Sequence, residues 1–84
     1  MDFNDNFGVG ESTIFQFESP ENSLQKIMIT GDSFDVKILT PGNKEKFDDS
    51  YKNKADLSWF STAGKNTIKI QNTGQSELNA QGTL

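Results

Sequence analysis

The 84-residue sequence contains no histidine, no cysteine and no arginine. Without histidine it lacks the commonest general base at neutral pH, and without cysteine it has no thiol nucleophile, disulfide or thiolate metal site. No remaining residue is placed to activate a serine or threonine hydroxyl. Adjacent carboxylates on a strand point to opposite faces and do not converge on one substrate. We therefore expect no enzymatic activity.

The missing arginine also limits the choice of partner. Eight lysines against twelve acids leave a net charge of −4, and no guanidinium is present to grip phosphates, so no nucleic-acid partner is expected. No apolar run approaches the roughly 20 residues that a membrane-spanning helix needs. The first residues have neither the basic nor the apolar region of a signal peptide, and Met1 could be native or follow a trimmed signal. The oligomeric state stays open.

Apolar residues make up only 32% of the chain, but seven phenylalanines are among them and the pattern is regular. Residues 12–18, 24–30, 34–39 and 67–71 alternate between apolar and polar side chains, as strands with one buried face do. The inward members of these runs, with one residue from the last strand, form the predicted core between two sheets: Phe15, Phe17, Ile27, Ile29, Phe34, Val36, Ile38, Ile68, Ile70 and Leu78.

Turn-forming residues punctuate the chain every eight to twelve positions, at 19–23, 31–33, 40–43, 63–66 and 72–74. Further strands are expected at 57–61 and 77–84. The charged stretch 44–56 has no clear period and is interpreted as a loop with room for a short strand near 46–49. The prediction is a flexible arm over residues 1–11 and one all-β domain over 12–84, a small jelly-roll-like β-sandwich of six to eight short antiparallel strands.

Two segments resemble motifs of the bacterial pre-peptidase C-terminal domains. Residues 34–43 (FDVKILTPGN) look like that family's strand followed by a Pro-x-Gly turn, and residues 63–70 (AGKNTIKI) are similar to its Ala-Gly strand. Residues 14–17 and 78–84 resemble its opening and closing strands. The order of strands is also similar to that of the Golgi-dynamics β-sandwich domains. The likeness covers roughly residues 12–84 and departs from the family at Asn66, where an aromatic residue is usual.

The resemblance implies a sandwich that is secreted, non-enzymatic and appended to a larger enzyme or surface protein. Some members of the family bind Ca²⁺ through loop carboxylates, but no complete ligand set carries over to this sequence. No catalytic domain is expected within these 84 residues, so the accessory role stays an expectation.

Candidate binding residues come from the stretch 44–61, because loops on a rigid β scaffold are where binding side chains concentrate. Tyr51 and Phe60 are the expected aromatic anchors, with Lys52 and Lys54 as contacts at the rim. Trp59 shares a strand face with other apolar residues and is interpreted as a core residue. An aromatic ring in such a loop suits either a sugar ring or a peptide.

Asp48, Asp49 and Asp56 are the candidate metal ligands, because carboxylates in one polar loop can surround a hard cation such as Ca²⁺. The more economical interpretation is that they are solvated acids, and no cofactor is expected. Residues 2–6 place oxygen side chains at alternate positions, as a calcium loop begins. The glycine and glutamate that such a loop needs at its sixth and twelfth positions are absent.

The sequence therefore favours a non-catalytic accessory module of a secreted or surface-attached bacterial protein, which contacts a protein or a carbohydrate. Two alternatives stay open. The chain could be a small stand-alone bacterial or phage inhibitor or immunity protein that acts in the cytoplasm, or a module that Ca²⁺ stabilises.

Overall fold

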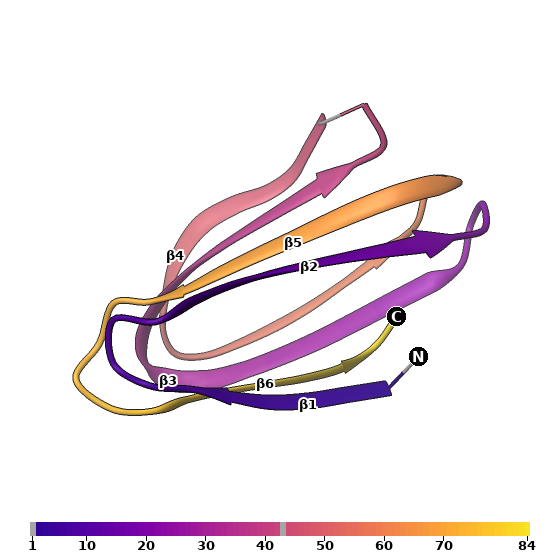
Figure 1. Ribbon diagram of the computed structural model, residues 1–84. Helices are drawn as coiled ribbons and strands as arrows, with labels where there is room; N and C mark the ends of the chain where they lie inside the picture. Colours follow the sequence, from indigo (N-terminus) through magenta and orange to yellow (C-terminus); the bar gives the residue numbers. More distant parts are fainter. Residues whose placement is uncertain (1, 43) are drawn as a thin grey trace.

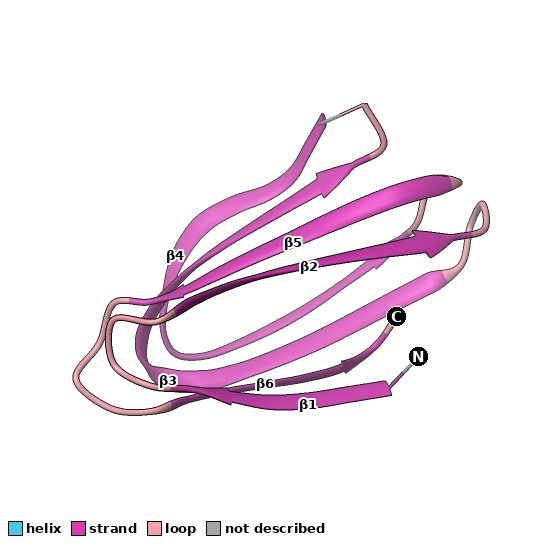
Figure 2. Cartoon of the chain, viewed as in Figure 1, coloured by secondary structure: helices cyan, strands magenta, loops and turns pink. Residues whose placement is uncertain are grey.

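Six antiparallel strands make up the fold in the computed structural model, which describes residues 2–42 and 44–84 (Figures 1 and 2). Within these residues there is no helix of the length and apolar character that crossing a bilayer requires. The all-β class predicted from the sequence is confirmed. The strands are β1 (Asp2–Phe7), β2 (Ser12–Ser19), β3 (Leu24–Thr40), β4 (Lys44–Phe60), β5 (Gly64–Asn72) and β6 (Leu78–Thr83).

The strands form one sheet, in the order β1-β6-β3-β5-β2 with β4 paired to β3, and this sheet curls into two layers (Figure 1). The upper layer contains β2, β5, residues 34–40 of β3 and residues 44–52 of β4. The lower layer contains β1, β6, residues 24–30 of β3 and residues 54–60 of β4. The predicted sandwich is confirmed, and its two layers share one long hairpin.

That hairpin changes layer at a corner where Gly31 of β3 pairs with Asn53 of β4. The register shifts there, so Asp32 is an extra residue on β3, and Asn53 has a φ of 70°. A bulge of this kind bends a strand and increases its twist. Residues 31–33 were expected to be a turn, but they are a bulge inside one continuous strand. Turn-forming residues mark a bend here and not a chain reversal.

The corner is fastened to the connection between β5 and β6. The Thr73 backbone N–H donates to the Ser33 carbonyl at 3.0 Å, and the two hydroxyls lie 3.0 Å apart. The Gln75 N–H donates to the Asp32 carboxylate at 3.1 Å. The residue that the bulge adds to β3 therefore holds a loop in place.

Asn72 ties the end of β1 to the same corner. Its buried side-chain amide donates to the carbonyls of Phe7, Gly8 and Ser76 at 3.3, 3.1 and 2.8 Å. Its carbonyl oxygen accepts the Gly74 N–H at 3.0 Å. One side chain thus satisfies backbone groups from two separate connections, which would otherwise be costly to bury.

At the other end of the hairpin the chain reverses through Pro41 and Gly42. Gly42 has a φ of 84°, as the third position of the predicted turn requires. Asn43, the last residue of that turn, lies outside the described residues.

The core lies between the layers and includes eight of the ten predicted residues, all fully or almost fully buried. The other two, Phe15 and Phe17, are half-buried on β2 and pack against the core. The interpretation of Trp59 as a core residue is confirmed. Four apolar residues that the predicted core omitted are also buried: Phe7, Ala55, Leu57 and Ala80.

Two predicted irregular segments are strands. The flexible arm expected over residues 1–11 is wrong for Asp2–Phe7, which pairs with β6 along its whole length. The loop expected at 44–56 is wrong as well, because these residues belong to β4. Both strands lie at edges of the sheet and expose polar side chains on both faces, so their sequences show little of the alternation that marks a half-buried strand.

The Tyr51 ring lies against the core, stacked on Phe34 with the ring centroids 5.9 Å apart. Removal from water, and to a lesser extent the negative charge of Asp49, raise the pKa of the Tyr51 phenol above its usual value of 10.0. The neutral phenol is therefore the form that the folded chain favours.

Replacing Phe34 with alanine should lower the free energy of unfolding by roughly 3–5 kcal/mol, as deletion of a fully buried ring does. Phe60→Ala is the matched control, because this ring is 64% exposed and its loss should change stability by no more than about 0.5 kcal/mol. Urea denaturation of the two variants checks this. Equal midpoints would mean that the strand register is wrong.

The corner makes a separate prediction. Asn53→Val should destabilise the fold by about 1–2 kcal/mol, because a β-branched residue tolerates a positive φ poorly. Asn53→Gly should be close to neutral or slightly stabilising. A valine variant as stable as the glycine variant would contradict a left-handed conformation at this position.

Tyr51 is the only tyrosine, so the ultraviolet absorbance of its phenolate reports its titration directly. Its folded pKa lies above its unfolded value, so the stability it contributes is complete below pH 10 and is lost as the pH rises through the folded pKa. The native titration midpoint should fall when urea unfolds the chain, and it should fall partway in Asp49→Asn. Tyr51→Phe should lose less stability at high pH than the unchanged chain, because phenylalanine has no phenol to ionise. A midpoint that urea does not change would refute the buried orientation.

Candidate functional site

The outward side of the lower layer carries the strongest candidate site. On the second half of β4 the residues Lys54, Asp56, Ser58 and Phe60 alternate with buried ones, so all four face outward together. The strand register places them beside outward residues of β3, β6 and β1. We call this surface the lower outer face. Its other members are Leu24, Lys26, Met28, Thr30, Asn79, Gln81, Thr83, Asp2, Asn4 and Asn6.

A hollow of about 370 Å³ lies in this face. Strand pairing puts Lys26 beside Thr83, and Met28 between Gln81 and Asp56, so side chains from all four strands converge there. The lining supplies carboxylates that accept hydrogen bonds and an ammonium group that donates them. Its amide and hydroxyl groups can donate and accept. The residues around it are Asp2, Phe3, Lys26, Ile27, Met28, Asp56, Gln81, Gly82 and Thr83.

Hydrogen bonds between side chains order the part of this face over β1 and β6. The Asn79 amide donates to the side-chain oxygens of Asn4 and Asn6 at 2.7 and 2.8 Å. The Thr83 hydroxyl donates to the Asp2 carboxylate at 3.0 Å. These groups are held in place before any ligand arrives, which lowers the ordering cost of binding.

One end of the lower outer face is apolar. Leu24 and Phe60 are directly opposite each other on β3 and β4, and they are 45% and 64% exposed. The next outward pair of β3 and β4 is Lys26 with Ser58, and Lys26 lines the hollow. An exposed aromatic ring therefore lies close to a hollow with several polar side chains on a single face.

The structure divides the four predicted binding residues. Phe60 and Lys54 share the lower outer face, while exposed Lys52 lies beyond the corner, opposite Ser33 in the upper layer. Tyr51 is half-buried against Phe34 and offers little of its ring to a partner. The four residues do not form one patch, because they belong to a strand that bends and not to a loop.

The three predicted metal ligands are also separated. Asp48 and Asp49 are consecutive on β4 and point to opposite faces, and Asp56 is seven residues further on in the other layer. Among residues 2–42 and 44–84 no group of three acidic side chains is placed to hold a metal ion. Asp48 instead approaches Lys37, with 4.0 Å between Oδ2 and Nζ.

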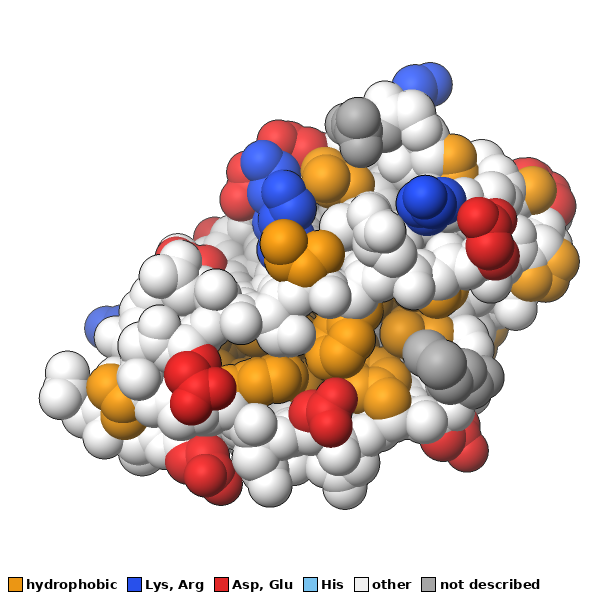
Figure 3. All heavy atoms as spheres, viewed as in Figure 1, with side chains coloured by type: hydrophobic (Ala, Val, Ile, Leu, Met, Phe, Trp, Pro, Cys, Tyr) orange, Lys and Arg blue, Asp and Glu red, His pale blue; other side chains and the backbone are white. Residues whose placement is uncertain are grey.

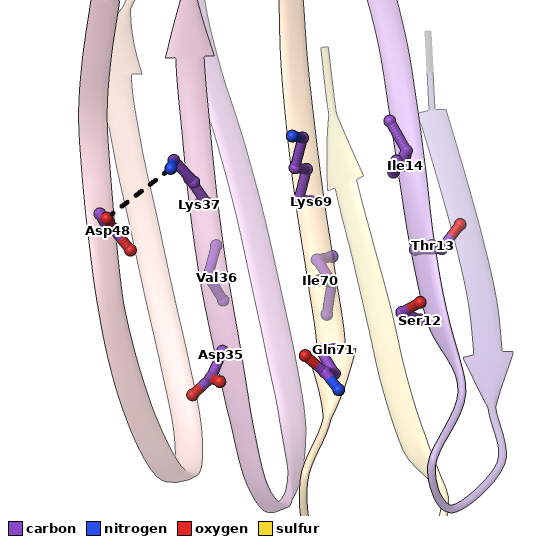
Figure 4. Close-up of a pocket in the computed structure, with 10 residues that line it drawn as sticks. All are labelled: Ser12, Thr13, Ile14, Asp35, Val36, Lys37, Asp48, Lys69, Ile70 and Gln71. Carbon is purple, nitrogen blue, oxygen red and sulfur yellow. Dashed lines mark ion pairs between the residues drawn. The ribbon is translucent and has the colours of Figure 1, made fainter.

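A second hollow, of about 240 Å³, lies on the outward side of the upper layer (Figure 4). It crosses β2, β5, β3 and β4, with Ile14, Lys69, Lys37 and Asp48 in one cross-strand row. Lys37 also pairs with Glu45 at 3.2 Å. This hollow is lined without an aromatic ring, which distinguishes it from the region around Phe60.

Asn66, which takes the place of the family's aromatic residue, points inward and is fully buried. Its amide donates to the Ser19 hydroxyl at 3.0 Å and to the Gly64 carbonyl at 3.1 Å. The departure is therefore structural, since Asn66 fastens the β4–β5 turn to the end of β2 and touches neither hollow.

Sequence reasoning missed Lys26, Gln81 and Leu24, which complete the lower outer face. The alternation in 24–30 had already assigned Lys26 to the outward side, but its neighbours on β6 and β4 depend on strand order. No local pattern gives that order, because strands far apart in the sequence pair in the lower layer.

No protein-family model matches the chain, and no curated protein sequence matches it. Solved structures do. The pre-peptidase C-terminal domain of a collagenase from Bacillus anthracis is similar with a TM-score of 0.73 and 6% sequence identity, over 99% of this chain and 88% of that one.

The CENP-C cupin domain of Drosophila melanogaster is similar with a TM-score of 0.63 and 13% identity. That similarity covers 98% of this chain but only 58% of the cupin chain. At these identities the comparisons establish the fold alone. They confirm the resemblance noted in the sequence: the chain has the fold of a pre-peptidase C-terminal domain.

Proposed function

We propose that the chain is a non-catalytic binding module that recognises a glycan through its lower outer face. The observation that carries the proposal is the exposed Phe60 ring next to a hollow of about 370 Å³ on the same face, which several polar side chains line. Binding sites commonly combine an apolar contact surface with a few convergent polar groups. This face provides both.

A sugar ring has an apolar face and a hydroxyl-bearing edge, and the lower outer face matches the two. Phe60 and Leu24 offer apolar surface on which a ring can stack. Asp56 accepts hydrogen bonds, Lys26 donates them and Gln81 does both, so hydroxyl groups find complementary partners. The net charge of −4 disfavours acidic polysaccharides, so the expected ligand is a neutral glycan.

The composition supports a role without catalysis, because the chain has no histidine and no cysteine to act as base or nucleophile. The shared fold with a domain of a bacterial collagenase supports placement beside a larger secreted or surface protein. In that setting a small module holds its larger neighbour near a polymer and leaves the chemistry to it.

Native gel electrophoresis through neutral polysaccharides such as xylan, glucomannan or starch tests the proposal. At least one of them should retard the chain. Phe60→Ala should weaken binding about fivefold or more, since truncating an aromatic anchor typically costs over about 1 kcal/mol. Ile14→Ala is the matched control, because Ile14 is 62% exposed on the outward side of the upper layer.

Two outcomes would reject the proposal. One is a full panel of neutral polysaccharides that leaves migration unchanged. The other is retardation that Phe60→Ala does not affect, or that Ile14→Ala reduces equally, because the contact would then lie away from the lower outer face.

A further inference from the structure

The free strand edges of this fold differ in how well they are protected against pairing with another chain. β4 has two register shifts against β3, a residue at positive φ, and a dense run of lysines and acids. β1 has Asp5 on its inward side, exposed between Phe3 and Phe7. Bulges and inward-pointing charges are the devices by which natural sheets block strand addition.

β2 has none of these devices. It ends the sheet order and pairs only with β5 among the described strands, in a register without a shift over eight residue pairs. Residues 12–17 contain no charge and no proline, and Glu18 is the only charged residue of the strand. Its exposed side chains include Ile14, and its inward side chains include Phe15 and Phe17. β2 is therefore a free edge with a regular register and a single charged residue.

An apolar opening adjoins this edge. β1 and β2 are the two ends of the curled sheet, and side chains bridge them in place of backbone hydrogen bonds. The Phe15 ring lies 5.1 Å from that of Phe3 and 6.4 Å from that of Phe7. Figure 3 shows hydrophobic side chains gathered in a hollow between β2 and β1 on this side of the molecule. We call this opening the aromatic seam.

The surroundings of the aromatic seam are acidic. In Figure 3 acidic side chains border the hollow along the β1 side, while the lysines on this face lie above β2. Asp5 is turned toward the seam from β1, and exposed Glu11 lies in the connection from β1 to β2. A second copy of this chain would bring the same acids together, whereas a cationic partner would meet complementary charge.

We propose that the free edge of β2 binds an extended cationic segment of another protein by strand addition. The partner's backbone pairs with β2, and the side chains on its inward side cover Phe15 and Phe17 and include a lysine or arginine that meets Asp5. Main-chain hydrogen bonds provide the affinity, and the apolar and cationic side chains on the inward side provide the specificity. This site is separate from the proposed glycan site, which lies on the outward side of the lower layer.

The probe is a capped heptapeptide of alternating threonine and valine in which lysine replaces the central valine, so that lysine and valines share one face, and it is added to the full chain at low salt. Backbone amide exchange, followed by nuclear magnetic resonance, should slow within residues 12–19 and remain unchanged in β4. A peptide with glutamate in place of lysine should bind much more weakly. The lysine peptide with alternate N-methylated amides should not bind, because it cannot donate hydrogen bonds along its edge.

Charge variants complete the design. Asp5→Lys should weaken binding roughly threefold, as expected for loss of an exposed ion pair. Asp49→Lys is the matched control, since Asp49 is an exposed acid on the inward side of β4, at the opposite edge. Phe60→Ala should leave peptide binding intact, so failure of the glycan proposal and failure of this one are distinguishable.

Three results would overturn the proposal. Equal binding by the N-methylated peptide would mean adsorption through side chains alone. Equal binding by the glutamate peptide would remove the charge argument. Protection of the β2 amides that point away from β5 in the absence of peptide, together with a dimeric mass in sedimentation, would assign the edge to a second copy of the chain.

Discussion

The two-layered fold depends on a single corner, where β3 and β4 bend together at Gly31 and Asn53. A Cβ atom at position 31 would lie only 3.1 Å from Leu78 Cγ. Because glycine has no Cβ, the bent strand can pass close to Leu78. The hairpin continues through the corner. On that side, therefore, the same two strands and the hydrogen bonds between them run from the upper layer into the lower one. Asp32, the residue that the bulge adds, in turn orders the connection from β5 to β6.

A sheet that is curled once has two open sides, and aromatic pairs close both. On one side Phe3 meets Phe15 across the gap between β1 and β2. On the other, Phe47 contacts Trp59 edge to face at 5.9 Å, between the two halves of β4. These contacts bury apolar surface without backbone pairing, so they hold the layers together but leave the flanking strand edges unsaturated. The small size of the domain makes such contacts a substantial part of its core.

Sequence reasoning succeeded where a strand has one buried and one exposed face. The alternation of Phe34, Val36 and Ile38 is of this kind, and these three side chains are completely buried. It failed at the edge strands β1 and β4, because β1 buries little besides Phe7 and bulges interrupt the period of β4. For the site, an exposed Phe60 followed from alternation with Trp59. The hollow beside it did not, since four strands build it and their order is a property of the whole chain.

Pairing between the first and last strands also sets how the module responds to tension. Asp2 lies opposite Thr83, so the chain enters and leaves the fold at neighbouring points (Figure 1). A pull on both ends would load the hydrogen bonds between β1 and β6 one after another, as a zipper opens, and not all together as in shear. Such a geometry yields at low force.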